Sequence, residues 1–401
     1  MDAYILDWLN LLLRWLHLIT GAAWIGASFY FVLLDNSLRP ASKQEDIKRG
    51  IHGDYWAVHG GGFYHSKKYL TGPKTEPLPM DLHWSKWEAY TTWLSGMGLL
   101  AIIYWFGAST YLIDRNVMAL SPAPAIAISA AFIAGGWLVY DALCRLLAGR
   151  ENLLAGIVFV LVMAADWSLF QVFGARAAYV HVGAMMGTMM VANVLFHIIP
   201  GQKKMVAAIR AGRPVDPMPG VIGKQRSVHN TYFTLPVLFI MISNHYPMTY
   251  SHPYGWAVLG AIMLAGVLIR QFFVLRLRGR IVPALPVIAI LLLVAIAVSI
   301  APKSVDKTAG SVTMAQVKAV IDQRCITCHA AQPTQPGFNQ PPKGVILQSA
   351  EQIQSHAAKI AETTSIRYMP IGNLTQMTDA ERVLIASWYA QQVATPDAKK
   401  P

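Results

Sequence analysis

The sequence predicts an all-α protein, in which a polytopic membrane helix bundle of about eight spans over residues 1–301 precedes a small all-α domain over residues 313–401. Composition predicts the bundle, because 54% of the residues are hydrophobic and only 13% are charged, far from the average for soluble proteins. The gathering of apolar residues into long runs predicts it as well. The stretch 302–312, rich in small and charged residues, marks a linker between the two parts.

A transmembrane helix needs about 17–25 mostly apolar residues in succession. The runs that meet this requirement lie at roughly 5–34, 87–107, 123–147, 151–172, 177–199, 230–245, 255–275 and 281–301. The first run begins with MDAYILDWLN, which carries two acidic residues and no basic segment. It is therefore expected to remain as a membrane anchor and not to be removed as a signal peptide.

Lysine and arginine are distributed unevenly between alternate loops. Nineteen of them lie in one set of loops and two in the other, and basic loops are retained on the cytoplasmic side. The N-terminus and, after eight crossings, the C-terminal domain are therefore expected outside the cell membrane. The net charge of +12 is then a signal of topology and of contact with membrane lipid. No basic stripe interleaved with aromatic residues points to a nucleic acid.

The C-terminal domain contains a short motif with specific chemistry, Cys325-Ile326-Thr327-Cys328-His329. In a C-x-x-C-H sequence the two thiols add to the vinyl groups of a haem, and the histidine imidazole ligates the iron. A zinc site would need two more cysteine or histidine ligands nearby, and a thioredoxin-like pair would need a βαβ setting; neither is present. We therefore expect one covalent haem c, attached through Cys325 and Cys328, with His329 as an axial ligand.

The second axial ligand should be a soft donor some tens of residues further along. Met369 precedes Pro370 in the loop sequence RYMPIGN and is preferred, whereas His356 lies in a helical-looking run. Met377 and, upstream, Met314 are the other candidates. His/Met ligation favours a relatively high reduction potential, so this haem is expected to accept electrons and pass them on.

The order of these parts resembles class I cytochromes c over residues 313–392. Thr378 and Glu381 form a capping box that is expected to open the closing helix. The resemblance implies that the haem is attached on the outer side of a bacterial inner membrane. The loop charges place the domain on the same side by an independent argument.

The loops with the basic surplus also concentrate histidine. One contains GIHGDYWAVHGGGFYHSKKYL and PLPMDLHWSKWEAYTTWLSG, and another ends in KQRSVHNTYFTLP. An anionic, hydrogen-bonding substrate on the cytoplasmic side would suit these segments. The alternative is that the basic residues anchor the loops to anionic lipid and the tryptophans belong to the interfacial belt. The Gly60-Gly61-Gly62 triplet is expected to lie close to another group.

Ionisable side chains inside membrane spans are costly and point to function. His17, His181 and His197 are candidate ligands of an additional haem b, and the alternative is that each hydrogen-bonds a neighbouring helix. The hydrocarbon core is about 30 Å thick, which is too long for one useful electron-tunnelling step. An inner substrate oxidised by an outer haem therefore needs a relay. Cys144, in the third span, is expected only to pack there.

Several long segments of the membrane part are similar to the PuuD family of integral-membrane, cytochrome c-linked urate oxidases. They are WIGASFYFVLLDNSL, HGGGFYHSKKY, LHWSKWEAYTTWLSG and QRSVHNTYFTLPVLFIMISNHYP. The fused cytochrome domain matches that family's architecture, so the resemblance covers nearly the whole chain. It implies oxidation of urate to 5-hydroxyisourate, with electrons passing to the chain's own haem c and then to a downstream cytochrome or terminal oxidase, without hydrogen peroxide.

Urate is a monoanion at neutral pH, so Lys or Arg would hold its charge, Asn230 or backbone groups would read its edges, and an aromatic ring would stack on its plane. The general base is expected among polar residues of the inner segments, namely His59, His65, His83, His229 and Glu88. Two other functions stay open. One is a different respiratory dehydrogenase or a quinol oxidase with a cytochrome c outlet, and the other is a non-catalytic electron relay or transporter.

Overall fold

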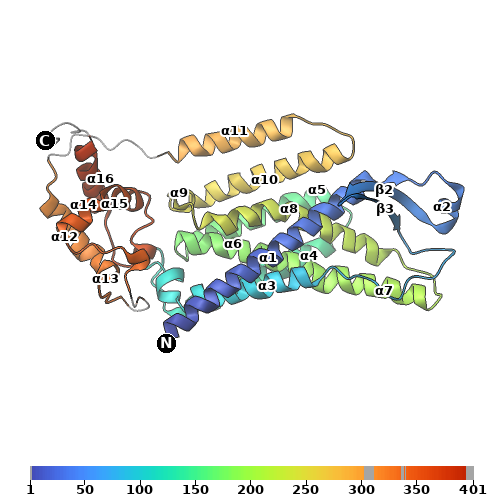
Figure 1. Cartoon of the computed structure of the whole chain (residues 1–401), viewed down its shortest axis with the longest axis horizontal. Helices are drawn as coiled ribbons and strands as arrows, with labels where there is room; N and C mark the ends of the chain where they lie inside the picture. The colour runs from blue at the N-terminus through green and yellow to red at the C-terminus, as the bar shows by residue number, and fades with distance from the viewer. Residues whose placement is uncertain (1, 302–310, 336–337, 339, 394–401) are drawn as a thin grey trace.

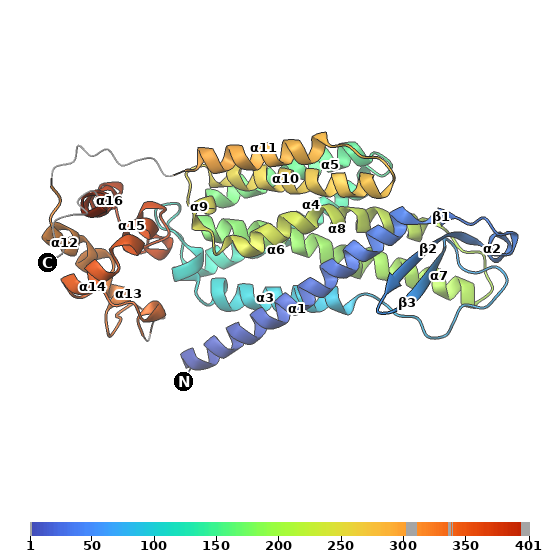
Figure 2. The same cartoon turned by 45° about the horizontal axis from the view of Figure 1, so that its top comes forward.

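The computed structural model describes residues 2–301, 311–335, 338 and 340–393. Long helices form a bundle, with a domain of shorter helices at one end and a β-hairpin at the other (Figure 1). Figure 2 shows the same separation after a rotation, so the two ends of the bundle carry different substructures. Most of the predicted linker, residues 302–310, and the tail 394–401 lie outside the described residues.

The helices of the bundle follow the predicted apolar runs. They are α1 (Asp2–Ser37), α3 (Trp87–Leu100), α4 (Pro122–Leu146), α5 (Glu151–Phe170), α6 (Ala175–Ala192), α8 (Met218–Ser243), α10 (Gly255–Leu277) and α11 (Ala284–Ser299). Among the described residues, five helical segments are long and apolar enough to cross a membrane: α1, α4, α5, α10 and the continuous helix Ala175–Arg210. This is the composition of a multi-pass membrane protein, and it agrees with the predicted all-α class.

Some helices are extended by wider, π-helical turns. α3 continues into η1 (Ala101–Trp105) and η2 (Ala108–Leu112), and α6 continues through η3 (Asn193–Ile198) into α7 (Ile199–Arg210). π-helical turns are rare and occur often at functional sites. The short α9 (Pro247–Tyr250) joins α8 to α10. α8 begins well before the predicted run at 230, because its first turns carry polar residues that a hydropathy pattern does not assign to a membrane helix.

The long loop between α1 and α3 folds into a small antiparallel sheet. Its strands are β1 (Arg39–Pro40), β2 (Ile51–His59) and β3 (Gly62–Tyr69), with α2 (Gln44–Arg49) before β2. Gly60 and Gly61 form the β2–β3 turn with φ of 59° and 81°, which glycine adopts without steric penalty. Within the described part of the chain, no heavy atom lies within 4 Å of a Cβ built at any glycine of the triplet. No group of the described protein therefore lies close to the triplet, and a close approach by a bound molecule stays a prediction.

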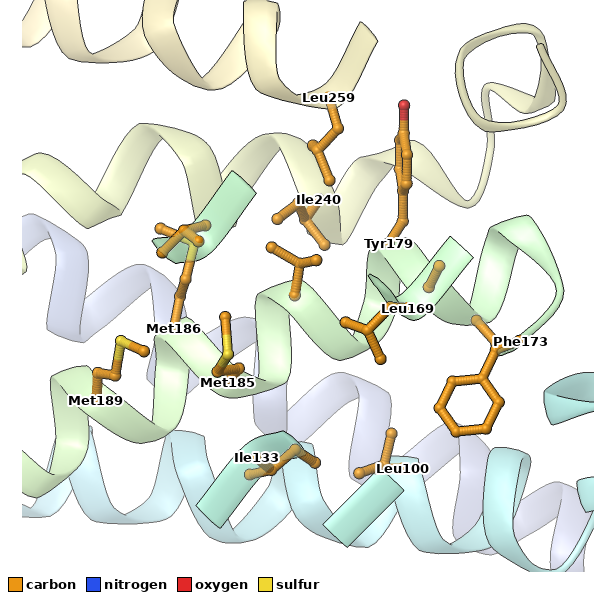
Figure 3. Close-up of a cluster of buried hydrophobic side chains, with 14 of the residues drawn as sticks. Leu100, Ile133, Leu169, Phe173, Tyr179, Met185, Met186, Met189, Ile240 and Leu259 are labelled. Atoms are coloured by element: carbon orange, nitrogen blue, oxygen red, sulfur yellow. The ribbon is translucent and has the colours of Figure 1, made fainter. Parts of the chain in front are cut away.

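Apolar side chains from α4, α5, α6, α8 and α10 form the main core (Figure 3). Ile133, Met185 and Ile240 are each at most 5% exposed. Glycines let these helices approach closely, because a Cβ at Gly136 would lie 2.4 Å from the Met185 sulfur and one at Gly183 would lie 2.6 Å from Ile240. Small residues at helix contacts are typical of packing in membranes.

The C-terminal domain has its own core of short helices. They are α12 (Met314–Arg324), α13 (Ile326–His329), α14 (Ala350–Ser355), α15 (Ala357–Ser365) and α16 (Asp379–Val393), with 3-10 turns η4 (Pro342–Gly344) and η5 (Ile371–Asn373). Ile321, Ile353 and Ile385 are fully buried at its centre. The predicted capping box is confirmed, because the backbone N–H of Glu381 donates to the Thr378 hydroxyl and the Thr378 N–H donates to the Glu381 carboxylate.

Candidate functional site

A buried carboxylate, that of Asp141 on α4, organises a polar cluster at the hairpin end of the bundle. Asp141 accepts hydrogen bonds from His197 Nε2 at 2.6 Å and from Arg226 at 2.7 Å. Arg145, one turn further along α4, donates to it at 2.9 Å. The Arg226 side chain is only 2% exposed, whereas that of Arg145 is 70% exposed. The negative charge of Asp141 therefore offsets the positive charge of one deeply buried guanidinium, that of Arg226.

The same guanidinium begins a chain of hydrogen bonds through the middle of the cluster. Arg226 donates to Asn193 Oδ1 at 3.3 Å. The Asn193 amide donates to the Tyr140 hydroxyl at 2.9 Å and to Asn230 Oδ1 at 2.8 Å. Arg226 Nε is buried and has no hydrogen-bond partner among the described residues. Buried charged donors are normally paired, so this nitrogen is a donor available to a ligand.

Tyr140 connects the cluster to the inner surface. Its hydroxyl lies 2.8 Å from His229 Nδ1, and His229 Nε2 lies 3.6 Å from Glu151 Oε2. Tyr140 is 2% exposed, and the side chains of His229 and Glu151 are 13% and 54% exposed. Cys144, expected only to pack, is buried beside His229. We call the set Tyr140, Asp141, Asn193, His197, Arg226, His229 and Asn230 the inner polar cluster.

Local helix geometry brings these side chains together. Asn193 and His197 lie four residues apart in the π-helical η3, whose wider turn keeps both on the face toward α4 and α8. Arg226, His229 and Asn230 lie at spacings of three and four on α8, and therefore on one face of that helix. Three helices that are hydrophobic elsewhere thus meet at a polar surface.

The structure places some of the predicted inner-loop residues elsewhere. His229 and Asn230 belong to the inner polar cluster, but His59 and His65 lie on the β-hairpin. His65 Nε2 pairs with Asp54, and the His65 ring stacks on Trp56 with centroids 4.1 Å apart. The hairpin histidines therefore form a separate exposed group.

His83 and Glu88, the other predicted candidates for the base, flank the start of α3. His83 is exposed and Glu88 lies in the first turn of the helix. In the described part of the chain, neither side chain makes a hydrogen bond or an ion pair that links it to the inner polar cluster.

The three histidines predicted as haem b ligands have separate surroundings. His181 is fully buried, and it donates through Nδ1 to the Ala177 carbonyl while Nε2 accepts from Ser129 at 2.6 Å. His197 Nε2 is bound to Asp141. His17 Nδ1 bonds the Thr92 carbonyl at 2.9 Å, and its Nε2 has no hydrogen-bond partner among the described residues. The three imidazoles therefore differ in which ring nitrogen is hydrogen-bonded, and haem b ligation stays a prediction.

The C-x-x-C-H motif spans the short helix α13. Burial raises the pKa of the Cys325 thiol to about 12, so the free thiol is neutral at physiological pH. His329 Nδ1 donates to the Val345 carbonyl at 3.0 Å, which fixes the ring and leaves Nε2 for a metal. Two thiols on one turn beside an oriented imidazole are the donor set that a covalent haem c requires.

The candidates for the second axial ligand differ in burial. Met377 is 3% exposed and packs in the domain core, and Met314 packs against the same core. His356 bonds a carbonyl of its own helix through Nδ1. Met369 lies in the loop after α15 and is partly exposed. Of the three candidate methionines, Met369 is therefore the one whose side chain is not packed in the core of the domain.

The loop that carries Met369 is held from two sides. Within the domain, buried Arg382 donates to the Met369 carbonyl at 2.7 Å. Toward the bundle, Tyr368 packs against the main core. A Cβ at Gly372 would lie 3.2 Å from the Thr110 carbonyl of η2. The loop therefore docks on the outer end of the bundle, opposite the inner polar cluster.

Four central members of the cluster, Tyr140, Asp141, Asn193 and Arg226, are absent from the residues expected from the sequence. Asp141 had a signal, because an acid inside the apolar run 123–147 is costly unless it has a partner. Arg226 lies before the run at 230–245, so the hydropathy pattern assigns it to a loop. A tyrosine or an asparagine in an apolar run is too common to mark Tyr140 or Asn193 as a site residue from the sequence.

Comparison with family models identifies the membrane part. The model of the family described as urate oxidase N-terminal matches residues 3–301, which is most of the chain. The chain therefore belongs to the urate oxidase N-terminal family, whose description relates it to the oxidation of urate and so to the oxidoreductases. Comparisons with curated proteins and with solved structures gave no match.

Proposed function

Because the chain belongs to this family, we propose that it is a membrane-bound urate oxidase of the PuuD type. It would convert urate to 5-hydroxyisourate and pass the electrons to its own haem c and then to the respiratory chain. The inner polar cluster is the proposed substrate site. Cys325 and Cys328, with His329 and Met369 as axial ligands, form the proposed haem c site.

The guanidinium of Arg226 is the observation that carries this proposal. It is 2% exposed among the helices of the bundle, and its Nε has no partner among the described residues. The guanidinium is permanently charged, and its Nε–H is a free donor while its other two nitrogens bond Asn193 and Asp141. Urate is a planar monoanion that can accept from this donor. The amides of Asn193 and Asn230 lie beside it and can read the polar edges of such a ring.

His229 is the proposed general base of the cluster. Its imidazole touches the Tyr140 hydroxyl on the buried side and faces Glu151 on the surface side. The overall step takes one urate monoanion and one water to neutral 5-hydroxyisourate, one proton and two electrons. A base that removes the proton as the electrons leave makes a ring carbon electrophilic, and water adds there.

The C-terminal domain supplies the electron outlet in this proposal. A haem c in this domain would provide a one-electron acceptor of relatively high potential. The docking of the Met369 loop on η2 supports electron entry from the bundle, because it holds a ligand-bearing segment against the outer end of the helices. No hydrogen peroxide forms if the electrons leave through this outlet and not to dioxygen at the substrate. A downstream cytochrome or terminal oxidase would then reoxidise the domain.

The proposed location is a bacterial inner membrane, with the N-terminus and the cytochrome domain on the periplasmic side. Long apolar helices support a multi-pass membrane protein. The nineteen basic residues of one set of loops against two in the other support the orientation. The inner polar cluster lies at the hairpin end, which this orientation places toward the cytoplasm.

An additional haem b remains a proposal for the step between the two sites. His17 is the more open candidate, because Nε2 of His181 and of His197 is already hydrogen-bonded. Glycine lies against the His17 ring, since a Cβ at Gly96 would be 2.9 Å from His17 Cε1.

A second candidate function has a specific observation in its favour. An apolar pocket of about 470 Å³ lies between α4, α5 and α6, and Tyr140 of the inner polar cluster is among its lining residues. Gly135, Ala164 and Ala165 line it as well. An isoprenoid quinone from the lipid would fit such a pocket, so the runner-up function is a respiratory dehydrogenase or quinol oxidase with a cytochrome c outlet. A non-catalytic relay would give the inner polar cluster no task.

The deciding experiment is to add urate, without oxygen, to purified protein whose haem is oxidised, while recording the visible spectrum. Reduction of the c-type band by urate supports the proposed function, and an additional b-type band supports an intramembrane haem. Reduction by a quinol and not by urate would replace the proposal by the runner-up function. Peroxide formation in air would contradict the proposed electron outlet.

A matched pair of variants ties the activity to the site. Arg226→Lys keeps the charge but loses the free Nε–H donor, so we expect KM for urate to rise about tenfold, which corresponds to about 1.4 kcal/mol. Arg213→Lys makes the same change at an exposed arginine of the same inner surface and should leave KM unchanged. Equal KM values for the two variants would remove Arg226 from the substrate site.

A further inference from the structure

Two arms of the inner polar cluster reach the inner surface of the bundle. One runs from Asp141 to Arg145, whose side chain is 70% exposed. The other runs from Tyr140 through His229 to Glu151, whose side chain is 54% exposed. A guanidinium stays protonated at physiological pH, so the Arg145 arm cannot hand a proton to water. The hydroxyl, imidazole and carboxylate of the other arm can each exchange one.

The hydrogen bonds of the Glu151 arm also define a direction. The Asn193 amide donates to the Tyr140 oxygen, so the hydroxyl hydrogen is left to point at His229 Nδ1, 2.8 Å away. Nδ1 is then the acceptor and Nε2 carries the ring hydrogen. An imidazole that gains a proton on Nδ1 can release one from Nε2. His229 is thus oriented to take a proton from the buried side and release it toward Glu151.

Glu151 is held for this role by the helix that carries His229. Gln225 Nε2 donates to Glu151 Oε1 at 2.7 Å, which leaves Oε2 facing His229 Nε2 at 3.6 Å. That separation exceeds a direct hydrogen bond. A small rotation of the carboxylate or one bridging water closes it, and the partly exposed side chain has room for either.

From this geometry we propose that Tyr140, His229 and Glu151 form the path by which the proton of substrate oxidation leaves the inner polar cluster. The inference rests on the proposed function, in which one urate monoanion and one water give neutral product, one proton and two electrons. The electrons leave toward the C-terminal domain, and the Tyr140 hydroxyl gives its hydrogen to His229 Nδ1 as its oxygen takes up the proton released by the substrate. A second proton then leaves Nε2 for Glu151 and bulk water, which restores the neutral imidazole.

The groups that face His229 favour outward transfer. They are Tyr140 and Cys144 from α4, Glu151 from α5 and Arg226 from its own helix α8. The positive charge of Arg226 repels an imidazolium, whereas the carboxylate of Glu151 attracts the proton. A proton on His229 is therefore pushed from the buried side and drawn toward the surface. Glu151 acts through His229, so its role is that of a positioning residue and proton acceptor.

The test compares Glu151→Gln with Glu45→Gln in the haem-loaded, full-length protein in liposomes. Glu45 is an exposed carboxylate of α2 at the same end of the molecule, so the control removes the same charge from the same side. Urate consumption is followed without oxygen, with ferricyanide as the final electron acceptor. A pH dye reports proton release, and the rates are measured across the neutral pH range with and without added imidazole.

We expect Glu151→Gln to lower kcat about tenfold with KM unchanged, and we expect added imidazole to restore the rate. General acid–base catalysis accelerates a step by about 10²–10⁴-fold, and a proton outlet contributes part of that acceleration. His229→Gln should lower kcat about 100-fold, while Glu45→Gln matches the wild type. If the wild type turns over urate but Glu151→Gln matches Glu45→Gln in rate, pH profile and imidazole response, the proposed proton path is refuted while the proposed function stands. If wild type does not oxidise urate, the proposed function falls together with it.

Discussion

Replacing Asp141 with asparagine should lower the free energy of unfolding by about 3 kcal/mol, near the lower end of the range for a buried charge that loses its partner. Asp141 lies 2.7 Å from the Arg226 guanidinium, which is 2% exposed, and it also accepts from His197. Asparagine keeps an oxygen acceptor but no charge. Arg226 would then be a buried cation with only neutral acceptors around it.

The structure supplies an internal control for this magnitude. Arg145 contacts the same carboxylate at 2.8 Å, but its side chain is 70% exposed, so Arg145→Gln should cost less than about 1 kcal/mol. The double variant of Asp141→Asn with Arg226→Gln should cost less than the sum of its single changes, because the second change removes the charge that the first one stranded.

The measurement is a double-mutant cycle on purified protein in mixed detergent micelles, with unfolding by added dodecyl sulfate followed through tryptophan fluorescence. The chain has 12 tryptophans, so the signal reports the whole molecule. A cost for Asp141→Asn no larger than that for Arg145→Gln would refute the reasoning. Strict additivity in the cycle would refute it too, because the two charges would then be independent.

Three further predictions concern other parts of the chain. Met369→Ala should lower the midpoint potential of the haem, since His/Met ligation raises it. Met377→Leu should change the potential little and cost less than about 1.5 kcal/mol of stability. A potentiometric titration that finds the same potential in both variants as in the wild type would contradict Met369 as the ligand. Gly372→Ala and Gly344→Ala both place a side chain at positive φ, 56° and 69°, which costs about 1–2 kcal/mol each. Only the Cβ at position 372 would contact the bundle, so stopped-flow reduction of the haem by urate should slow in Gly372→Ala alone. Equal rates in the two variants would argue against docking of this loop. Asp166→Leu should raise the thermal unfolding midpoint, because Asp166 is fully buried and neither carboxylate oxygen has a partner among the described residues; a lowered midpoint would mean that the carboxyl contributes to stability.

The membrane helices could be predicted because lipid imposes a condition that each segment satisfies alone. A span must be continuously apolar for its full length, whatever its neighbours are. The run at 123–147 therefore locates α4 almost to the residue, Pro122–Leu146. The start of α8 could not be located in this way, because Arg226 is buried by neighbouring helices and not by its own sequence context.

The β-hairpin shows a signal that hydropathy alone overlooks. Two runs rich in aromatic and β-branched residues flank the glycine triplet, a pattern that favours a hairpin with a glycine turn. The stacking of Trp56 on His65 and the pairing of His65 with Asp54 then follow from the strand register.

The pairings inside the inner polar cluster depend on which helices are neighbours, and no local pattern encodes that. Asp141 stands out in its own span, but its partners His197 and Arg226 come from sequence positions far away. The place of His229 and Asn230 beside a basic loop is what predicts them as site residues. Asp141, whose carboxylate neutralises the buried charge of Arg226, stands out in the sequence only as an acidic residue without an evident partner in an apolar run.

The inner polar cluster and the docked Met369 loop lie at opposite ends of the helix bundle, and this separation decides how charge would move. Asn193 follows His181 by twelve positions on the helix Ala175–Arg210, about 18 Å at 1.5 Å per residue, and the core between them is largely aliphatic and methionine-rich (Figure 3). Under the proposed function, electrons travel outward across this core while the proton leaves on the inner side through Glu151. Negative charge then moves outward, so an inside-negative membrane potential favours turnover, by about 2.3 kcal/mol per electron per 100 mV for a full crossing. The same geometry means that the reaction consumes membrane potential at this step, and any energy it conserves must come from the downstream oxidase.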